Sequence, residues 1–264
     1  MSIESASSLA VVTGASSGIG WQLARQFAEH GFDVLICAED DGLSTAAAQL
    51  RSGEGGSITE VQADLATYDG VEALVSAIVA VGRPVDAVAL NAGIGNGGRF
   101  VDISLDDELR LIQTNIVSAV HLAKRLLPAM VVRGAGRLLF TASVASTMPG
   151  PFYATYAASK SFVLSFAEAL RYEVKDSGVT VTALMPGPTD TDFFDRADMQ
   201  DTPAGKGKKD DPGKVAADGF EALLAGRDHV VAGSMKNKVQ VAGTSILPDT
   251  AKAAIHAKLT EPQQ

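Results

Sequence analysis

The sequence predicts an α/β fold, a doubly wound parallel sheet of about seven strands with helices on both faces. Short apolar runs rich in β-branched residues alternate with longer segments whose apolar residues recur at helical spacing. Strands that are apolar along their whole length are typical of parallel sheets, because helices cover both faces. No internal repeat or linker divides the chain, so we expect one domain spanning residues 1–264 with right-handed crossovers between strands.

The predicted elements follow one another from residue 9 to residue 231. The first apolar run is followed by a glycine-rich turn and a helix in which Ile19, Leu23 and Phe27 share one face. The same alternation then repeats along the chain. We expect strands at 9–13, 32–37, 58–63, 85–90, 137–141, 179–185 and 229–231, and helices at 19–29, 43–51, 71–81, 106–133, 155–175 and 212–224.

Residues 189–213 interrupt this alternation. The segment is polar, contains prolines and glycines, and shows neither helical nor strand periodicity. A loop of this length inside a compact domain is usually functional or disordered. We therefore expect either a disordered insert or, as the favoured interpretation, a lid that closes over a substrate and excludes water.

The composition excludes several classes of function. The 264 residues include 22 Lys and Arg against 31 Asp and Glu, and the resulting net charge of −9 does not suit a nucleic-acid-binding surface. No apolar run approaches the roughly 20 residues of a membrane span. The first residues lack the basic segment of a secretory signal. We expect a cytoplasmic protein that binds neither nucleic acid nor membrane.

The single cysteine, Cys37, excludes an internal disulfide and any metal site built from paired cysteines. It lies in an apolar run and is interpreted as a small buried hydrophobic residue. The four histidines share no motif and no metal-ligand spacing. We therefore expect no metal site and no catalytic role for any of them: His30, His121, His229 and His256.

The turn after the first strand is a candidate binding site. Glycines at such a turn let the backbone approach a phosphate, and the start of the next helix offers free N–H groups and a partial positive charge. The glycine spacing differs from the G-x-G-x-x-G dinucleotide pattern, and methyltransferases, flavoproteins and plain tight turns share such glycines. The candidate phosphate-binding residues are Gly14, Ser16, Ser17, Gly18, Ile19 and Gly20.

Tyr156 and Lys160 lie four residues apart on a predicted helix and therefore share one face. An ammonium group beside a phenol favours the phenolate, so we expect Lys160 to lower the pKa of Tyr156 from its usual value of about 10. Such a phenol can exchange a proton with a carbonyl oxygen near neutral pH. Ser143 follows the fifth predicted strand, at the sheet edge where ligands bind in α/β proteins.

These features, taken in order, resemble the short-chain dehydrogenase/reductase family, in its single-domain branch with a Rossmann-like fold. The further matches are Asn91-Ala92-Gly93 after the fourth strand, Asn115 in the long helix and Pro186-Gly187 after the sixth strand. The resemblance covers residues 9–191. It implies an oxidoreductase in which a nicotinamide cofactor carries the hydride while the protein positions it and moves the proton.

The resemblance also implies a role for each matching residue. Tyr156 would act as acid or base, Ser143 would hold the substrate oxygen, and Lys160 would bind the nicotinamide ribose. Asn115 would position a water in a proton relay. The cofactor-binding residues implied beyond the glycine turn are Asp64, Leu65, Asn91, Ala92, Gly93, Ile116, Tyr156, Lys160, Pro186, Gly187, Thr189 and Thr191.

The end of the second predicted strand determines which nicotinamide cofactor fits. An acidic residue there bonds a free ribose 2′-hydroxyl and repels a 2′-phosphate. In the family, NAD users carry Asp at the position of Ala38, and NADP users often carry Arg at the position of Glu39. Asp40 and Asp41 follow here, with no Arg or Lys nearby. We predict NAD(H) over NADP(H), with Glu39, one position offset, near the ribose.

The substrate pocket is predicted to be apolar and aromatic, as ligand pockets usually are. No cationic residue is among its candidates, so we expect an uncharged secondary alcohol or ketone. The same residues also fit ordinary core or subunit contacts. The pocket candidates are Ile94, Ala145, Met148, Phe152, Tyr153, Phe193 and Phe194.

The predicted function is hydride transfer between NAD(H) and such an alcohol or ketone, with Tyr156 as acid/base. The alternative enzyme is an NADPH-dependent reductase of ketones or 3-oxoacyl thioesters. The alternative of another class is a nicotinamide-binding regulator without turnover.

The resemblance implies a homodimer or homotetramer in which helices 106–133 and 155–175 pair across a two-fold axis. The apolar residues Phe162, Phe166 and Leu170 fit burial in such a contact. The tail after Lys236 is available to pack against a neighbouring subunit.

Overall fold

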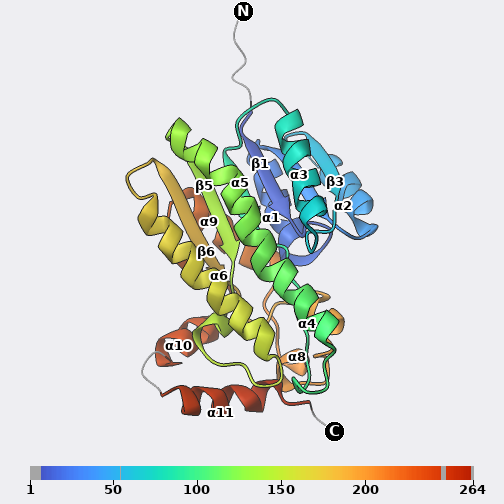
Figure 1. Cartoon of the computed structure of the whole chain (residues 1–264), viewed down its shortest axis with the longest axis vertical. Helices are drawn as coiled ribbons and strands as arrows, with labels where there is room; N and C mark the ends of the chain where they lie inside the picture. Colours follow the sequence, from blue (N-terminus) through green and yellow to red (C-terminus); the bar gives the residue numbers. More distant parts are fainter. Residues whose placement is uncertain (1–6, 54, 245–247, 263–264) are drawn as a thin grey trace, which may run out of the picture.

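A single sheet of seven parallel strands forms the centre of the molecule (Figure 1). The structure is a computed structural model that describes residues 7–53, 55–244 and 248–262, so residues 245–247 of the predicted tail lie outside the described residues. The strand order is β3-β2-β1-β4-β5-β6-β7. The predicted sheet is thereby confirmed, with strands β1 (Leu9–Thr13), β2 (Asp33–Ala38), β3 (Ile58–Gln62), β4 (Ala87–Leu90), β5 (Gly136–Thr141), β6 (Val179–Met185) and β7 (His229–Val231).

The order of the strands reverses at β1. This strand pairs with β2 on one side, where Val11 aligns with Leu35, and with β4 on the other, where Val11 aligns with Val88. The connections on the two sides of β1 leave the sheet in opposite directions, so a crevice opens beyond the carboxyl ends of β1 and β4. Ligands of doubly wound proteins bind at such a switch point.

Two hydrophobic cores cover the two faces of the sheet. Phe27 and Phe220, whose rings meet edge to face at 5.1 Å between centroids, belong to the core under one set of helices. Leu74, Leu122 and Val163 belong to the core on the opposite face. The helices over the first core are α1 (Gly18–Glu29), α2 (Gly42–Arg51) and α9 (Pro212–Leu224), and those over the second are α3 (Tyr68–Ala80), α5 (Ser118–Arg133) and α6 (Ala154–Glu173).

The long helix predicted at 106–133 is one continuous rod made of three parts. These are α4 (Leu105–Ile112), a π-helical turn η1 (Gln113–Val117) and α5, which ends at Gly134 in a left-handed conformation. Within the described residues, this rod alone is long and apolar enough to cross a membrane. The expectation that no apolar stretch reaches that length is therefore wrong for this helix. Its residues Leu122, Leu126 and Met130 are buried in the core of the domain.

The segment 189–213 is folded rather than structureless. It contains two short helices, α7 (Phe193–Arg196) and α8 (Pro203–Lys206), and the latter is capped by Thr202. A parallel bridge joins Thr189 to Asp210, with the Asp210 N–H donating to Pro188 O at 2.8 Å. The base of the predicted lid is thus closed by backbone hydrogen bonds, while its tip reaches the carboxyl end of the sheet.

Two helices follow β7 that the sequence pattern did not predict. They are α10 (Met235–Thr244) and α11 (Asp249–Thr260), and they lie beyond the carboxyl ends of the strands, with α11 passing beside α8 (Figure 1). The alanine-rich sequence of α11 favours a helix. Thr260 Oγ1 donates to Pro151 O at 2.8 Å. The described part of the tail therefore packs on its own chain, and its contact with a neighbouring subunit stays a prediction.

Candidate active site

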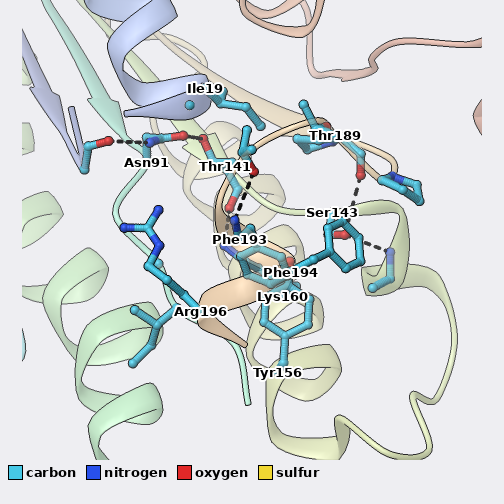
Figure 2. A pocket seen from close by; sticks show the side chains of 18 of the residues that line it. Ile19, Asn91, Thr141, Ser143, Tyr156, Lys160, Thr189, Phe193, Phe194 and Arg196 are labelled. Carbon is cyan, nitrogen blue, oxygen red and sulfur yellow. Dashed lines mark hydrogen bonds between the residues drawn. The ribbon is translucent and has the colours of Figure 1, made fainter. Parts of the chain in front are cut away.

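A cavity of about 570 Å³ opens at the carboxyl ends of the strands, at the point where the strand order reverses. Residues from the glycine turn, from the loops after β2 to β6, from the lid and from α10 and α11 line it. Figure 2 draws 18 of these side chains, and the ten that it labels converge from different elements on one space. Among the residues that the structure describes, no cluster of three His, Cys, Asp or Glu side chains could hold a metal ion.

The glycine turn forms the end of the cavity beside α1. Gly14 and Gly18 both have positive φ, at 65° and 56°, and a Cβ on Gly14 would lie 2.9 Å from Ala92 Cα. Ser17 begins α1 but makes no side-chain cap, so the first N–H groups of the helix remain available to a ligand. An anionic group fits this cradle because of those N–H groups and the helix dipole. All six residues predicted here line the cavity.

The end of β2 carries a different arrangement of charges from the one expected. Glu39 pairs with Arg110 of α4, which also donates to Asp64 Oδ2 at 3.1 Å. The expectation of no nearby cation is therefore wrong, because Arg110 lies 71 residues away in the sequence. Asp40 is placed against the glycine turn, where it accepts a hydrogen bond from Ser16 Oγ at 2.7 Å. Two carboxylates, Glu39 and Asp64, thus share the Arg110 guanidinium, and Asp40 lies apart from it.

Asp64 is held in its ionised form at this end of the cavity. Burial opposes its ionisation, but the N–H of Ala66 and the Arg110 guanidinium together hold the pKa of Asp64 below its usual range. The Arg110 charge is shared between Asp64 and Glu39. The net charge beside the glycine turn consequently stays negative at neutral pH.

Asn91 ties the strands together beneath the cavity. Its side-chain amide donates to Thr13 O at 3.2 Å, and Thr141 Oγ1 donates to Asn91 Oδ1 at 3.0 Å, as Figure 2 shows in part. Asn91 thus joins the carboxyl ends of β1, β4 and β5. Its neighbours Ala92 and Gly93 line the cavity as predicted, and a Cβ on Gly93 would come within 3.1 Å of the Lys160 ammonium nitrogen.

Ser143, Tyr156 and Lys160 come together at the centre of the cavity, as predicted (Figure 2). Lys160 is only 5 % exposed, and its Nζ donates to Thr141 O at 2.8 Å. Burial lowers the pKa of Lys160 to about 8. Ser143 Oγ accepts the N–H of Ala145 at 3.1 Å and lies in hydrogen-bonding reach of the Tyr156 phenol.

The electrostatics of Tyr156 differ from the expectation. Burial raises the pKa of Tyr156 to about 12, and the hydrogen bond with Ser143 only partly opposes this. Lys160 was expected to lower the pKa of the phenol, but its Nζ is turned toward Thr141 O and lies 5.8 Å from the centroid of the Tyr156 ring. In this arrangement the loss of solvent outweighs the attraction of the ammonium group.

Asn115 lies behind Lys160, in the π-helical turn η1. Its side chain is fixed by Ile94, whose N–H donates to Asn115 Oδ1 at 2.8 Å, and by its own bonds to Ile94 O and Ser159 Oγ. A separate cavity of about 10 Å³ lies between Asn115, Ser118, Thr141 and Lys160, among other residues. Roughly this volume holds one water molecule when polar groups surround it.

The substrate end of the cavity is apolar, although its lining differs from the predicted set. Ile94, Ala145, Tyr153, Phe193 and Phe194 line the cavity as expected. Met148 and Phe152 do not line it: Met148 is buried elsewhere, and Phe152 has a left-handed backbone conformation with φ of 63°. Ile116, expected beside the nicotinamide, is also absent from the lining, and Thr114 lines the cavity instead.

Several lining residues were missed because they come from the lid and the tail. Arg196 on α7 donates to Ser17 Oγ at 3.3 Å and so reaches the glycine turn from across the cavity (Figure 2). Asn237 on α10 packs against Gly187, and its amide donates to Asp210 Oδ2 at 2.7 Å. No periodicity or motif pointed to these residues. The others from the same segments are Met199, Pro203, Ala204, Gly207, Lys208, Asp210, His256, Leu259 and Thr260.

The fold and the cavity define an oxidoreductase that binds a nicotinamide dinucleotide. A phosphate cradle at the switch point of a parallel sheet lies next to a Ser-Tyr-Lys cluster that can hold and protonate a carbonyl oxygen. Residues 8–201 match the family model described as short chain dehydrogenase. The chain belongs to the short-chain dehydrogenase/reductase family and acts on carbonyl or alcohol groups, which confirms the predicted family, fold and enzyme class.

Known proteins resemble the chain beyond the matched core. Oxidoreductase UcpA of Salmonella typhimurium is 32% identical over 215 residues, covering 81% of this chain and 79% of its own. A short-chain dehydrogenase from Sphingobium yanoikuyae in complex with NADPH superposes with a TM-score of 0.81 at 25% identity, over 97% and 98% of the two chains. A 3-oxoacyl-[acyl-carrier protein] reductase with bound NAD from Brucella melitensis gives 0.71 at 26% identity, over 86% and 90%.

Proposed function

We propose that the protein transfers a hydride between NAD(H) and an uncharged secondary alcohol or ketone. The observation that carries this proposal is the cluster of buried Ser143 and Lys160 with partly buried Tyr156, which opens on one side to an apolar pocket and on the other to the glycine turn. A bound nicotinamide cofactor would donate or accept the hydride. The residues of the chain would bind the substrate oxygen and move the proton.

The hydroxyls of Ser143 and Tyr156 are the two groups that can hold a substrate carbonyl oxygen. In the direction of reduction, both would donate hydrogen bonds to this oxygen, and Tyr156 would then give up its proton. The resulting phenolate needs a nearby cation. Lys160, on the same face of α6, can supply that positive charge and also a hydrogen bond to the nicotinamide ribose.

The one-water cavity behind Lys160 supports a path for returning the proton. Asn115, Ser118 and Thr141 offer polar atoms around this space, next to the ammonium group of Lys160. A water there would link the catalytic cluster to the backbone of the π-helical turn. π-helical turns inside helices are frequent at functional sites, and this one places Asn115 beside the cluster.

The charges at the end of β2 support a preference for NAD(H). Glu39, Asp40 and Asp64 surround the ribose end of the cavity, and Arg110 is already paired with two of them. A 2′-phosphate would meet net negative charge there, whereas a free 2′-hydroxyl could donate to a carboxylate. Asp40, held against the glycine turn by Ser16, is better placed for this bond than the predicted Glu39.

The substitution Tyr156→Phe tests the proposed acid/base. We expect it to reduce turnover of a panel of secondary alcohols and ketones by at least about a thousandfold, because proton transfer typically contributes 10²–10⁴-fold and the substrate oxygen also loses a ligand. Binding of NADH, followed by cofactor fluorescence, should change little. Tyr172→Phe, at a residue that is 71 % exposed on the same helix, is the control. Substantial activity in Tyr156→Phe would contradict the proposal.

An NADPH-dependent reductase of ketones or 3-oxoacyl thioesters is the second candidate. Lys208 of the lid lines the cavity, so a cationic group is available at its mouth for the phosphate of a thioester carrier. The similar proteins from Sphingobium yanoikuyae and Brucella melitensis carry NADPH and NAD respectively. Measuring kcat/KM for simple ketones and a 3-oxoacyl thioester, each with NADH and NADPH, separates the two candidates.

We also propose that the chain forms a homodimer or homotetramer. The helical face made by α4, η1 and α6 leaves Leu109, Val117 and Phe162 between 40 % and 47 % exposed. Phe162 stacks on Phe166, which reaches the core behind it. An apolar face of this kind suits an isologous contact with a second copy.

A further inference from the structure

Helix α11 contributes a buried histidine to the wall of the substrate pocket. His256 is 4 % exposed and lines the cavity, although no sequence pattern predicted it there. Its Nε2 is hydrogen-bonded to the hydroxyl of Tyr153, which is itself 6 % exposed and lines the same cavity. On its other side, His256 Nδ1 contacts Pro149 O at 2.8 Å.

These two contacts determine which ring nitrogen carries the proton. The carbonyl of Pro149 can only accept, so Nδ1 must be the N–H that donates to it. Burial lowers the pKa of His256, which keeps the ring neutral and leaves a lone pair on Nε2. The hydroxyl of Tyr153 must therefore donate to Nε2. Both nitrogens are occupied, so His256 cannot serve as a general base for the substrate.

This pairing separates the roles of two neighbouring tyrosines. The rings of Tyr153 and Tyr156 are stacked, with centroids 5.5 Å apart and planes inclined by 21°. Burial raises the pKa of Tyr153 as well, so it stays protonated. With its O–H committed to α11, Tyr153 offers the pocket only its ring, and Tyr156 is the one phenol of the pair left to face Ser143.

Resting on the proposed carbonyl chemistry, we propose that His256 is a positioning residue. By accepting the Tyr153 hydroxyl, it fixes the Tyr153 ring as the wall of the substrate pocket beside Tyr156 and keeps a second phenol from competing for the substrate oxygen. Helix α11 lies outside residues 8–201, the part that matches the family model. The tail of this chain thereby shapes substrate binding without taking part in proton transfer.

A double-mutant cycle tests the pairing. His256→Leu and Tyr153→Phe should each raise KM for an apolar ketone about fivefold and change kcat less than twofold. Both changes remove the hydrogen bond that holds the aromatic ring at position 153 in place. The double variant should also show about a fivefold effect, since each change removes the same interaction. His256→Gln keeps a donor and an acceptor and should recover part of the loss. If the two changes acted independently, KM of the double variant would rise about twenty-five-fold, and this result would overturn the proposal.

Nitrogen-15 NMR of the wild-type histidines supplies a readout that requires no substrate. The expected spectrum has His256 protonated on Nδ1 and unprotonated on Nε2 at neutral pH, with the Nε2 resonance shifting in Tyr153→Phe. Ile255→Ala, at an exposed neighbour on the same helix, should leave this resonance unchanged. An Nε2-protonated ring would overturn the inference. If no alcohol or ketone is turned over, the proposed function fails, and the tautomer still decides the pairing.

Discussion

At the scale of single residues, the buried charge of Lys160 serves the proposed function but lowers the stability of the fold. Lys160 is 5 % exposed, its ammonium group is bonded to a neutral carbonyl, and it takes part in no ion pair within the described residues. Burying a charge without a countercharge is costly, and burial accordingly lowers the pKa of Lys160 to about 8. The residue nevertheless stays charged at neutral pH, as its proposed role beside Tyr156 requires.

The pH dependence of stability should reveal this buried charge. Unfolded Lys160, with an ordinary pKa of 10.5, keeps its proton at pH 9.5, while the folded form loses it above about 8. The unfolded state then binds more protons, so stability rises with pH through this window. From pH 7 to pH 9.5, the cofactor-free wild type should gain about 2 kcal/mol relative to Lys160→Met in urea unfolding. Lys124→Met, which changes an exposed lysine, is the control and should gain as much stability as the wild type over the same pH range. If the wild type gained about 2 kcal/mol relative to Lys124→Met as well, the gain could not be assigned to Lys160.

Arg110 offers a residue-level test of cofactor preference. It partly neutralises Glu39 and Asp64 beside the cavity, so Arg110→Gln should make this end more negative and the enzyme more selective against NADPH. Because exposed ion pairs are worth under about 1 kcal/mol, we expect the ratio of kcat/KM for NADH over NADPH to rise about two- to fivefold. Arg99→Gln, which removes an equal charge elsewhere, is the control. A fall in the ratio would show that Arg110 binds the 2′-phosphate.

At the scale of elements, the lid reaches the glycine turn directly. Thr191 packs on Gly18, where an added Cβ would lie 2.9 Å from Thr191 Cγ2, and Arg196 of α7 bonds Ser17 Oγ at 3.3 Å. The turn presents the free N–H groups of α1, so Arg196 lies where a cofactor diphosphate would need a cation. The lid therefore forms part of the wall of the cofactor site.

We expect Arg196→Gln to weaken NADH binding about fivefold, because a charge-assisted hydrogen bond to phosphate is lost at a partly exposed site. Titration of cofactor fluorescence measures this, and the defect should shrink at high salt. Lys206→Gln removes a positive charge from the same lid but from a residue that does not line the cavity. An equal loss in both variants would assign the effect to overall charge rather than to contact.

The elements that could be predicted are those in which burial leaves a periodic pattern. Every predicted strand and long helix is present within a few residues, because each buries a face against the sheet. The helices α7, α8, α10 and α11 escaped prediction for a physical reason. They are short or pack across the irregular end of the sheet, so their apolar residues do not mark a single stripe. His256 of α11, for example, is a polar residue that is buried by its hydrogen bonds and by the ring of Tyr153.

At the scale of the whole molecule, the site residues also divide into those that a local sequence pattern predicts and those that it does not. The glycine turn and the Tyr156–Lys160 pair could be predicted because their residues are close in sequence and belong to one element. The contacts that tune the site join residues far apart: Arg110 to Glu39, or Tyr153 to His256 across 103 positions. The direction of the Tyr156 pKa also depends on total burial, which no local pattern specifies.

The assembly of the molecule is the last property that can be tested. If the face around Phe162 joins two copies, a buried carboxylate there would be unpaired on both sides of a two-fold axis. Phe162→Asp should therefore shift the mass measured by light scattering toward the monomer at micromolar concentration. Val79→Asp on α3, at a residue that is 71 % exposed, should leave the mass unchanged. An unchanged oligomer in Phe162→Asp would place the contact on another face.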